Sequence, residues 1–391
     1  MRRYFERLRS GGWVLAAGLV FALAMAGTAP PSQAEDALLT EMVDFTGTFI
    51  YLGVKSPGLV IGAIRNGETV VRGYGEVSKG SGRAPDGDTL LRVGSITKVF
   101  TGAALASMAA DGKVQFTDKL QDGLGWDVTI PELDGKSIRL INLATHSAGL
   151  PRESQIGPLG EGGDPSKLTT KEDYIASLKQ FPLLYPPGTG MLYSNFGFDL
   201  LAQALANIEG KPYPQLLKER VLDPAGLKDT VFDLRPGDEA HTMQGHNFDG
   251  SPMPLLQTSP MIVGAGGLYS TANDMLRWLK WHLDRFASKD ADMRLLDHRS
   301  YLSPDGLDPV FGFGEAGHMD EMGLGWVFMQ PDGDRPLILQ KSGGLQGEFS
   351  YIAFAPTRGV GVFVSMNEFN VAGFPEMAKA VNDLITEIAP R

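Results

Sequence analysis

Strand-like segments gather at the two ends of this chain, and helical segments fill the interval between them. Residues 58–78 contain two β-type runs joined by Asn66-Gly67, a dipeptide that strongly favours a two-residue hairpin turn. Residues 377–389 have the apolar spacing of a closing helix. This order predicts an antiparallel sheet built from both ends of the chain. The other short β-rich runs are residues 323–330, 337–344, 349–356 and 359–367.

The interval between these runs is predicted to be mainly helical. Residues 195–209 are amphipathic and Gly210 ends that helix, and Asp111-Gly112 ends an earlier one. We therefore predict an α/β (α+β) fold, in which helices flank the antiparallel sheet and a helical subdomain is inserted. Weak periodicity predicts loops near a cleft mouth at residues 235–262 and 286–320. A single domain at 35–391 would comprise a sheet part at about 35–94 and 262–391 and a helical part at about 95–261.

The first 34 residues are predicted to be a signal peptide. Four arginines precede an apolar run at residues 13–26, which is too short to span a bilayer comfortably. Small residues before Glu35 suit a signal peptidase, so we expect cleavage after Ala34 and a periplasmic location. Cleavage after Ala26 and retention as an uncleaved anchor are the alternatives. We expect no membrane-spanning segment after residue 34.

The charge balance and the lack of cysteine narrow the classes of partner and site. Removing four arginines and one glutamate with residues 1–34 leaves 31 basic and 45 acidic residues, a formal net charge of −14. This acidic excess argues against nucleic-acid partners. The absence of cysteine excludes disulfides, thiolate metal sites and cysteine nucleophiles. The histidines show no metalloprotease spacing, and we expect neither a metal nor a cofactor. The oligomeric state stays open.

Ser95 and Lys98 stand three residues apart where an apolar helix begins. In one interpretation Ser95 caps the helix and Lys98 lies on its solvent side, which is the commoner meaning of such a pair alone. In the other, the side chains meet on one helix face, and Lys98 accepts the proton of Ser95, which becomes a nucleophile. That role requires a neutral amine, so burial and cationic neighbours would have to lower the pKa of Lys98.

Two further polar motifs follow in the chain. Tyr193-Ser194-Asn195 precedes a helix and offers a phenol for proton transfer and an amide for hydrogen-bonding a peptide-like substrate. Lys341-Ser342-Gly343-Gly344 lies on an apparent edge strand, where the cation and the hydroxyl suit a substrate carboxylate. Its glycines would allow close approach of a substrate backbone, and one N–H could complete an oxyanion hole. The structural alternatives are a turn with a core tyrosine and a strand end with a glycine turn.

Taken in this order, with strands at both ends, the three motifs resemble the serine β-lactamase and penicillin-binding protein family. The Tyr-x-Asn triplet is similar to the class C branch and its D,D-carboxypeptidase/endopeptidase relatives, whereas class A carries Ser-Asp-Asn. Similar segments extend over nearly the whole of residues 35–391 in family order, including 90–105, 141–151, 186–213 and 264–279. The resemblance implies the β-lactamase/transpeptidase-like fold, acyl transfer on peptidoglycan stem peptides, and binding of β-lactams.

The resemblance also implies a role for each matched residue. Ser95 would attack the carbonyl of a D-alanine-containing peptide bond and form an acyl-enzyme, with Lys98 and Tyr193 sharing the proton transfers. Which of Lys98 and Tyr193 is the principal base stays open. The backbone N–H groups of Ser95 and Gly344 would form the oxyanion hole. The substrate-binding residues would be Asn195 for the acyl-side amide, Lys341 and Ser342 for the terminal carboxylate, and Gly343 and Gly344 beside the substrate backbone.

Three features bear on the subtype. Lys341 stands where esterase-like relatives often carry histidine, which favours a substrate with a carboxylate. No deacylating glutamate of the class A kind is found, so fast β-lactam hydrolysis is not implied. His146, beside Ser147, is interpreted as ordering a buried turn rather than as a catalytic base. We therefore predict a periplasmic serine D,D-peptidase, with a class C-like β-lactamase or an esterase of the same fold as alternatives.

Overall fold

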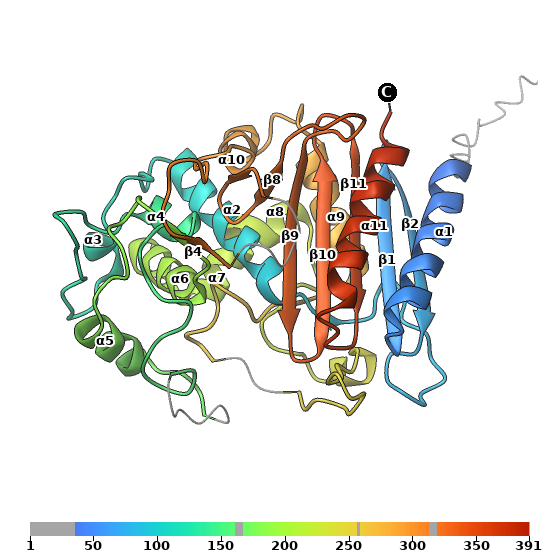
Figure 1. Ribbon diagram of the computed structural model, residues 1–391, viewed down its shortest axis with the longest axis horizontal. Coiled ribbons are helices and arrows are strands. Elements are labelled where there is room, and N and C mark those ends of the chain that lie inside the picture. The colour runs from blue at the N-terminus through green and yellow to red at the C-terminus, as the bar shows by residue number, and fades with distance from the viewer. Residues whose placement is uncertain (1–35, 161–166, 256–258, 313–318, 391) are drawn as a thin grey trace, which may run out of the picture. The chain divides into compact units, whose positions relative to one another are not determined.

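Seven strands form an antiparallel sheet in the order β2-β1-β11-β10-β9-β8-β7 (Figure 1). The computed structural model describes residues 36–160, 167–255, 259–312 and 319–390. The sheet joins the two ends of the chain, as the sequence predicts, because β1 pairs with β11. The strands are β1 (Gly58–Arg65), β2 (Glu68–Gly75), β7 (Glu321–Met322), β8 (Val327–Met329), β9 (Ile338–Leu345), β10 (Glu348–Ala355) and β11 (Val360–Met366).

The β1–β2 hairpin turns at Asn66 and Gly67, as predicted. Their φ angles of 52° and 87° are both positive, which fits the type I′ turn that Asn-Gly favours. On its other side β1 pairs with β11 in a register that opposes Leu59 with Met366. The hairpin is therefore held in place by a strand from the far end of the chain.

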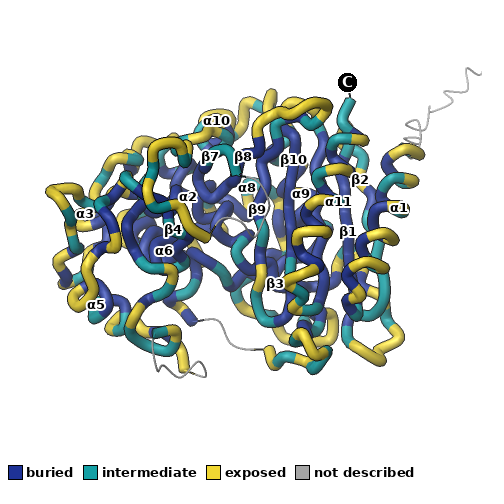
Figure 2. Tube along the Cα trace, viewed as in Figure 1, coloured by how far each residue is buried: buried dark blue, intermediate teal, exposed yellow. Residues whose placement is uncertain are grey.

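Helices cover both faces of this sheet. α1 (Ala37–Val54) and α11 (Gly373–Ile388) pack on one face, toward which Leu59 and Ile61 point (Figure 1). Val60 and Ile64 point to the opposite face and belong to a second core. This alternation follows the two-residue period of a strand. The sheet is therefore buried on both sides, as the dark strands in Figure 2 show.

Among the described residues α1 is long and apolar enough to span a bilayer, with a mean hydropathy of 1.2, contrary to the expectation from sequence. The apolar composition of α1 is explained by its packing on the sheet. Leu39, Val43 and Ile50 are buried against the sheet layer and α11, while Phe45 and Phe49 are exposed on the opposite side. The helix supplies one wall of an apolar core.

The second face of the sheet carries α9 (Ala272–Leu283) and, beyond it, the inserted helices. α2 (Thr97–Ala110) runs through the main core, and most of its residues are buried. α6 (Asn195–Glu209) packs on α2 and begins at the second motif. The remaining helices are α3 (Leu120–Leu124), α4 (Leu140–Ala144), α5 (Lys171–Gln180), α7 (Tyr213–Leu217), α8 (Asp223–Ala225) and α10 (Ala291–Asp297).

Two local predictions are wrong. β9 is not an edge strand, because residues 338–340 pair with β8 on one side and β10 on the other. β8 has only three residues, however, so within the described part of the chain Lys341–Leu345 pairs with β10 alone. Residues 286–320, expected to be loop, contain α10, which packs on α2. Seven helical residues are too few to show a clear period in sequence.

Candidate active site

Ser95 lies in a 3-10 turn (Gly94–Ile96) that connects β3 (Leu91–Arg92) to α2. Gly94 has a φ of 52°, in the left-handed region that glycine adopts readily, and turns the chain toward the helix. α2 begins after Ser95, and its N-cap residue, Ile96, makes no side-chain capping bond. Lys98 is fully buried rather than on the solvent side. The helix-capping interpretation is therefore wrong.

Three oxygen atoms surround the amine of Lys98. Its Nζ lies 3.1 Å from Ser95 Oγ, 2.6 Å from Asn195 Oδ1 and 2.7 Å from the carbonyl oxygen of Ala265. Burial lowers the pKa of Lys98 well below its usual value, and the positive charge of Lys341 lowers it further. A neutral amine has two N–H donors and one lone pair. The two carbonyl-type oxygens can accept both donors, which leaves the lone pair toward the Ser95 hydroxyl.

The second motif enters the site where β4 (Met191–Leu192) ends and α6 begins. Ser194 caps α6, because its Oγ accepts the N–H of Gly197 at 2.9 Å. The cap fixes Asn195 at the first helical position. Asn195 Nδ2 donates to the carboxylate of Glu153 while its Oδ1 accepts from Lys98. Both ends of this amide are therefore held before any substrate arrives.

Three basic side chains surround the ring of Tyr193. The Nζ atoms of Lys98 and Lys341 lie 4.9 Å and 5.1 Å from the ring centroid, and the guanidinium carbon of Arg152 lies 5.0 Å from it. Lys341 Nζ also donates to the Tyr193 hydroxyl at 3.4 Å and to the carbonyl of half-buried Ser342 at 3.1 Å. The third motif thus meets the second one at this phenol.

Glycines let β9 lie directly against the turn that carries Ser95. A Cβ added at Gly343 would lie 1.9 Å from the carbonyl oxygen of Val93, and one at Gly94 would lie 2.7 Å from the backbone nitrogen of Gly344. These distances are far below any non-bonded contact, so a side chain at either position would force the two segments apart. The backbone of Gly344 is therefore placed beside Ser95.

His146 holds the turn beneath Tyr193, as expected from the sequence. Its Nδ1 accepts the N–H of Ser194 at 3.0 Å, and its ring stacks on Tyr193 with centroids 4.4 Å apart. Burial lowers the pKa of His146 well below its usual value, so the ring is neutral. Ser147 instead contacts Asn142 and Thr145 through its hydroxyl. The two residues do not form a nucleophile–base pair.

Two carboxylates at the site, half-buried Glu153 and fully buried Asp199, were missed in the sequence. Glu153 lies beside Asn195, and burial raises its pKa. Asp199 accepts the N–H groups of Gly264 and Ala265 at 3.0 Å and 2.9 Å, which fixes the segment whose carbonyl contacts Lys98. Burial raises the pKa of Asp199 to about 7. Its position one turn after Asn195 on the buried face of α6 is the signal that could have identified it.

The three motifs open on a cleft of about 540 Å³. Ser95, Asn195 and Gly344 line it, together with Glu153 and Arg92. Ser259 and Ile262, from the region predicted to form loops at a cleft mouth, also line it. The eight site residues predicted from sequence therefore come together around one cleft and the phenol behind it.

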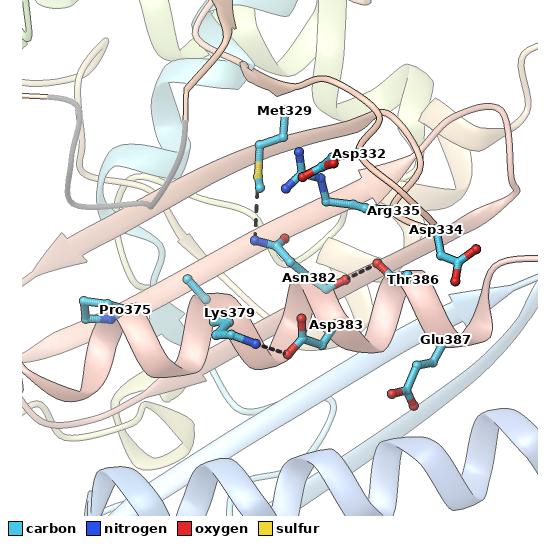
Figure 3. Close-up of a pocket in the computed structure, with 11 residues that line it drawn as sticks. Met329, Asp332, Asp334, Arg335, Pro375, Lys379, Asn382, Asp383, Thr386 and Glu387 are labelled. Carbon is cyan, nitrogen blue, oxygen red and sulfur yellow. Dashed lines mark hydrogen bonds and ion pairs between the residues drawn. The ribbon is translucent and has the colours of Figure 1, made fainter.

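A second hollow of about 530 Å³ lies between α11 and the β8–β9 turn (Figure 3). Its polar groups pair with one another: Lys379 Nζ contacts the carboxylate of Asp383 at 2.6 Å, and Thr386 donates to the carbonyl of Asn382 at 2.9 Å. No residue of the three motifs lines it. This hollow is therefore separate from the candidate site.

In the comparison with known families, residues 36–386 match the beta-lactamase family. The chain belongs to that family. Membership of this family, predicted from the three motifs, is confirmed, and so is the predicted fold.

Within the beta-lactamase family the chain is similar to the D-alanyl-D-alanine-carboxypeptidase/endopeptidase AmpH of Escherichia coli strain K12, with 34% identity over 91% of each chain. It is also similar to the crystal structure of a beta-lactamase/D-alanine carboxypeptidase from Yersinia pestis, with a TM-score of 0.80 and 33% identity. That match covers 90% of this chain and 98% of the other. A Pseudomonas syringae structure at 19% identity and a TM-score of 0.73 shares the fold.

Proposed function

We propose that this beta-lactamase family member is a serine D,D-peptidase, a D-alanyl-D-alanine carboxypeptidase and endopeptidase that cleaves peptidoglycan stem peptides through an acyl-enzyme. The observation that carries the proposal is the buried Lys98 amine 3.1 Å from Ser95 Oγ. Identity of 34% over 91% of the chain to the E. coli carboxypeptidase/endopeptidase supports the same assignment. The cation of Lys341 beside the cleft suits the terminal carboxylate of a D-alanyl peptide.

Acylation begins when Ser95 Oγ bonds to the substrate carbonyl carbon and its proton passes to Lys98 Nζ. Lys98 is the base in this step, because its amine contacts Oγ directly and burial favours its neutral form. The ammonium that forms is stabilised by the oxygens of Asn195 and Ala265. The N–H groups of Ser95 and Gly344 donate to the oxyanion, which is usually the largest single contribution to such a step.

Collapse of the tetrahedral intermediate breaks the C–N bond, and the leaving amine needs a proton. Tyr193 relays that proton from Lys98, because the Nζ atoms of Lys98 and Lys341 lie 4.9 Å and 5.1 Å from its ring centroid and Lys341 donates to its hydroxyl. Lys341 and Ser342 bind the substrate carboxylate, and the second N–H of Asn195 Nδ2 donates to the acyl-side amide of the substrate. Water then hydrolyses the ester and frees Ser95.

We place this activity in the periplasm. Residues 1–34, which lie outside the described residues, have the sequence pattern of a secretory signal peptide. Residues 36–391 form one compact unit, and the chain contains no cysteine that an oxidising compartment could crosslink. Cleavage after Ala34 would remove the leader and leave that compact unit intact.

The test uses purified protein with a pentapeptide muropeptide and with crosslinked muropeptide dimers, followed by mass spectrometry. The wild type should release D-alanine from the pentapeptide and convert dimers into monomers, and Ser95→Ala should do neither. Ser81→Ala, which changes an exposed serine, is the matched control and should behave as the wild type. Release by Ser95→Ala at the wild-type rate, or no release by the wild type, would contradict the proposal.

A β-lactamase of the class C kind is the second candidate, because a Pseudomonas fluorescens beta-lactamase is 24% identical over 84% of this chain. Nitrocefin separates the two: a peptidase stays acylated and turns over slowly, whereas a β-lactamase turns over fast. An esterase of the same fold would hydrolyse p-nitrophenyl esters, keep that activity in Lys341→Ala, and release no D-alanine.

A further inference from the structure

Three side chains that can ligate a metal converge outside the cleft. His282 lies in the last turn of α9, Asp297 ends α10, and His298 follows it directly. One ring nitrogen from each histidine and one carboxylate oxygen all lie within 4.8 Å of one another. His282 Nδ1 is 2.7 Å from His298 Nε2 and 3.8 Å from Asp297 Oδ2. None of the three lines the cleft at Ser95, and the proposed reaction does not use them.

Two polar atoms of this cluster are buried without a hydrogen-bond partner among the described residues. Asp297 and His282 are both fully buried. Asp297 Oδ2 accepts the indole N–H of Trp326 at 3.0 Å, but Asp297 Oδ1 and His282 Nε2 have no partner. Buried polar atoms in native proteins are nearly always paired. A cation beside the carboxylate would supply the partner that Oδ1 lacks.

The position of His282 shows which of its nitrogens is available as a ligand. Trp278 and Trp326 meet its ring at steep angles of 75° and 89°, with centroids 4.1 Å and 5.3 Å away. Its Nδ1 is the nitrogen that faces His298 and Asp297. Nδ1 is therefore the atom that can ligate a cation shared with those two residues.

The protonation state of the two histidines also suits a cation. Desolvation lowers the pKa of His282 well below its usual value and that of His298 to about 4, so both imidazoles are neutral at neutral pH. Arg294 is a nearby cationic group, and its charge opposes a second positive charge at the cluster. Its guanidinium lies over the ring of Trp281 and donates to the carbonyls of Ala287 and Lys289. Those contacts hold the Arg294 charge in place.

We propose that His282, Asp297 and His298 bind one divalent transition-metal cation with the ligand preferences of Zn²⁺. Two neutral imidazoles and one carboxylate are ligands that zinc commonly takes, with Zn–N distances of about 2.0–2.1 Å. Tetrahedral angles at those distances require the two nitrogens to separate to roughly 3.3 Å. His298 can supply this movement, because it is half-buried and follows the end of α10. Each imidazole stays neutral on binding, with its hydrogen on the ring nitrogen that faces away from the cation, and Asp297 binds as the carboxylate, releasing any proton that it carries.

The site would have a structural role. It joins the ends of α9 and α10 to Trp326, and α10 packs on α2, the helix that carries Lys98. A cation there would tie three segments that are distant in the chain, and it would stabilise the folded state because the unfolded chain lacks the site. The fourth ligand position would be filled by Asp297 Oδ1 or by water from the exposed side next to His298.

The test is a titration of the chelator-treated full chain with Zn²⁺, read by native mass spectrometry and by thermal unfolding. The wild type should bind one ion per chain, and its Tm should rise by several degrees at a hundredfold excess over Kd. His298→Gln and Asp297→Asn should both lose the bound ion and the Tm shift. His241→Gln changes an exposed histidine elsewhere and should keep both. Circular dichroism before titration establishes that each variant is folded.

A second probe guards against a variant that fails to fold. Co²⁺ bound to wild-type protein should give visible d–d absorption bands of a site with nitrogen and oxygen ligands, and these should disappear on adding excess Zn²⁺. The proposal is overturned if the wild type retains no ion at micromolar Zn²⁺, or if folded His298→Gln binds Zn²⁺ with the same stoichiometry and Tm shift.

Discussion

Replacing Gly343 by alanine would separate the two segments that form the proposed oxyanion hole. The new Cβ would lie 1.9 Å from the carbonyl oxygen of Val93. Carbon–oxygen contacts between neighbouring strands lie at about 3.3–3.6 Å, so the segments must move apart by at least about 1 Å. Gly343 lies within β9 and does not have a positive φ, so alanine is acceptable to the backbone itself. The clash alone opposes the substitution.

The expected magnitude follows from the geometry of hydrogen bonding. An oxyanion-hole donor must lie about 2.7–3.1 Å from the oxyanion, and a displacement of about 1 Å removes the N–H of Gly344 from that range. Loss of one such donor slows acylation by about 10²–10³-fold. The strain of overpacking also destabilises the fold by about 1–3 kcal/mol, which leaves most of the protein folded at 25 °C.

The assay is the rate of acylation by a fluorescent penicillin, measured on gels after rapid quenching. Gly53→Ala is the matched control, because it makes the same substitution on α1, where the nearest atom, Glu376 Oε2, lies 3.9 Å from the new Cβ. Gly343→Ala should acylate at least 100-fold more slowly than the control at 25 °C. Acylation at the control rate would refute the role assigned to the close contact between β9 and the Ser95 turn.

Three further predictions concern Lys98, Lys341 and His298. Only neutral Lys98 can accept a proton, so the rate of acylation by a neutral ester should rise with pH through a pKa well below the usual lysine value. Lys341→Ala removes the neighbouring positive charge that helps to lower this pKa, so the rise should move to higher pH. An unmoved profile would exclude Lys341 as a contributor. Lys341→Ala should also reduce D-alanine release by about 10–100-fold while changing p-nitrophenyl ester hydrolysis much less. The reason is that only the peptide presents a carboxylate to the Lys341 ammonium. Equal losses on both substrates would contradict this prediction. Burial lowers the pKa of His298 to about 4, so the unfolded chain binds a proton below pH 6.5 that the folded chain does not. In EDTA, urea unfolding should therefore show about 2 kcal/mol less stability at pH 5 than at pH 7 from this residue alone, and His298→Gln should lose that part of the pH dependence; the same pH dependence in the variant would refute it.

The sequence predicted that the candidate site residues lie together because they stand in short motifs with fixed order. Ser95, Lys98, Tyr193 and Lys341 were each ambiguous alone, and their order together with strands at both ends identified the family. The hairpin at Asn66-Gly67 was predictable because two positive φ angles restrict the residues that can form it.

The missed features depend on long-range contacts. Glu153 and Asp199 are single carboxylates with no motif around them, and only the fold brings them to Asn195 and Ala265. The place of β9 within the sheet depends on its pairing with β8, which lies in the predicted β-rich run 323–330 but whose partner strand the sequence does not specify. α10 is held by its contact with α2 rather than by a periodic sequence of its own.

The pairing of β1 with β11 has a consequence for a chain that is delivered from its N-terminus. An isolated two-stranded hairpin is marginally stable in water, so β1 and β2 are not stably folded until β11, about 300 residues later in the chain, has been synthesised. At synthesis rates of about 5–20 residues per second, that interval lasts roughly 15–60 seconds. During it Lys98 has neither its burial nor the charge of Lys341 beside it, and therefore keeps its proton. Under the proposed mechanism the nascent polypeptide therefore carries an unreactive Ser95 hydroxyl until its final strands are added, and Ser95 becomes activated only when the sheet is complete.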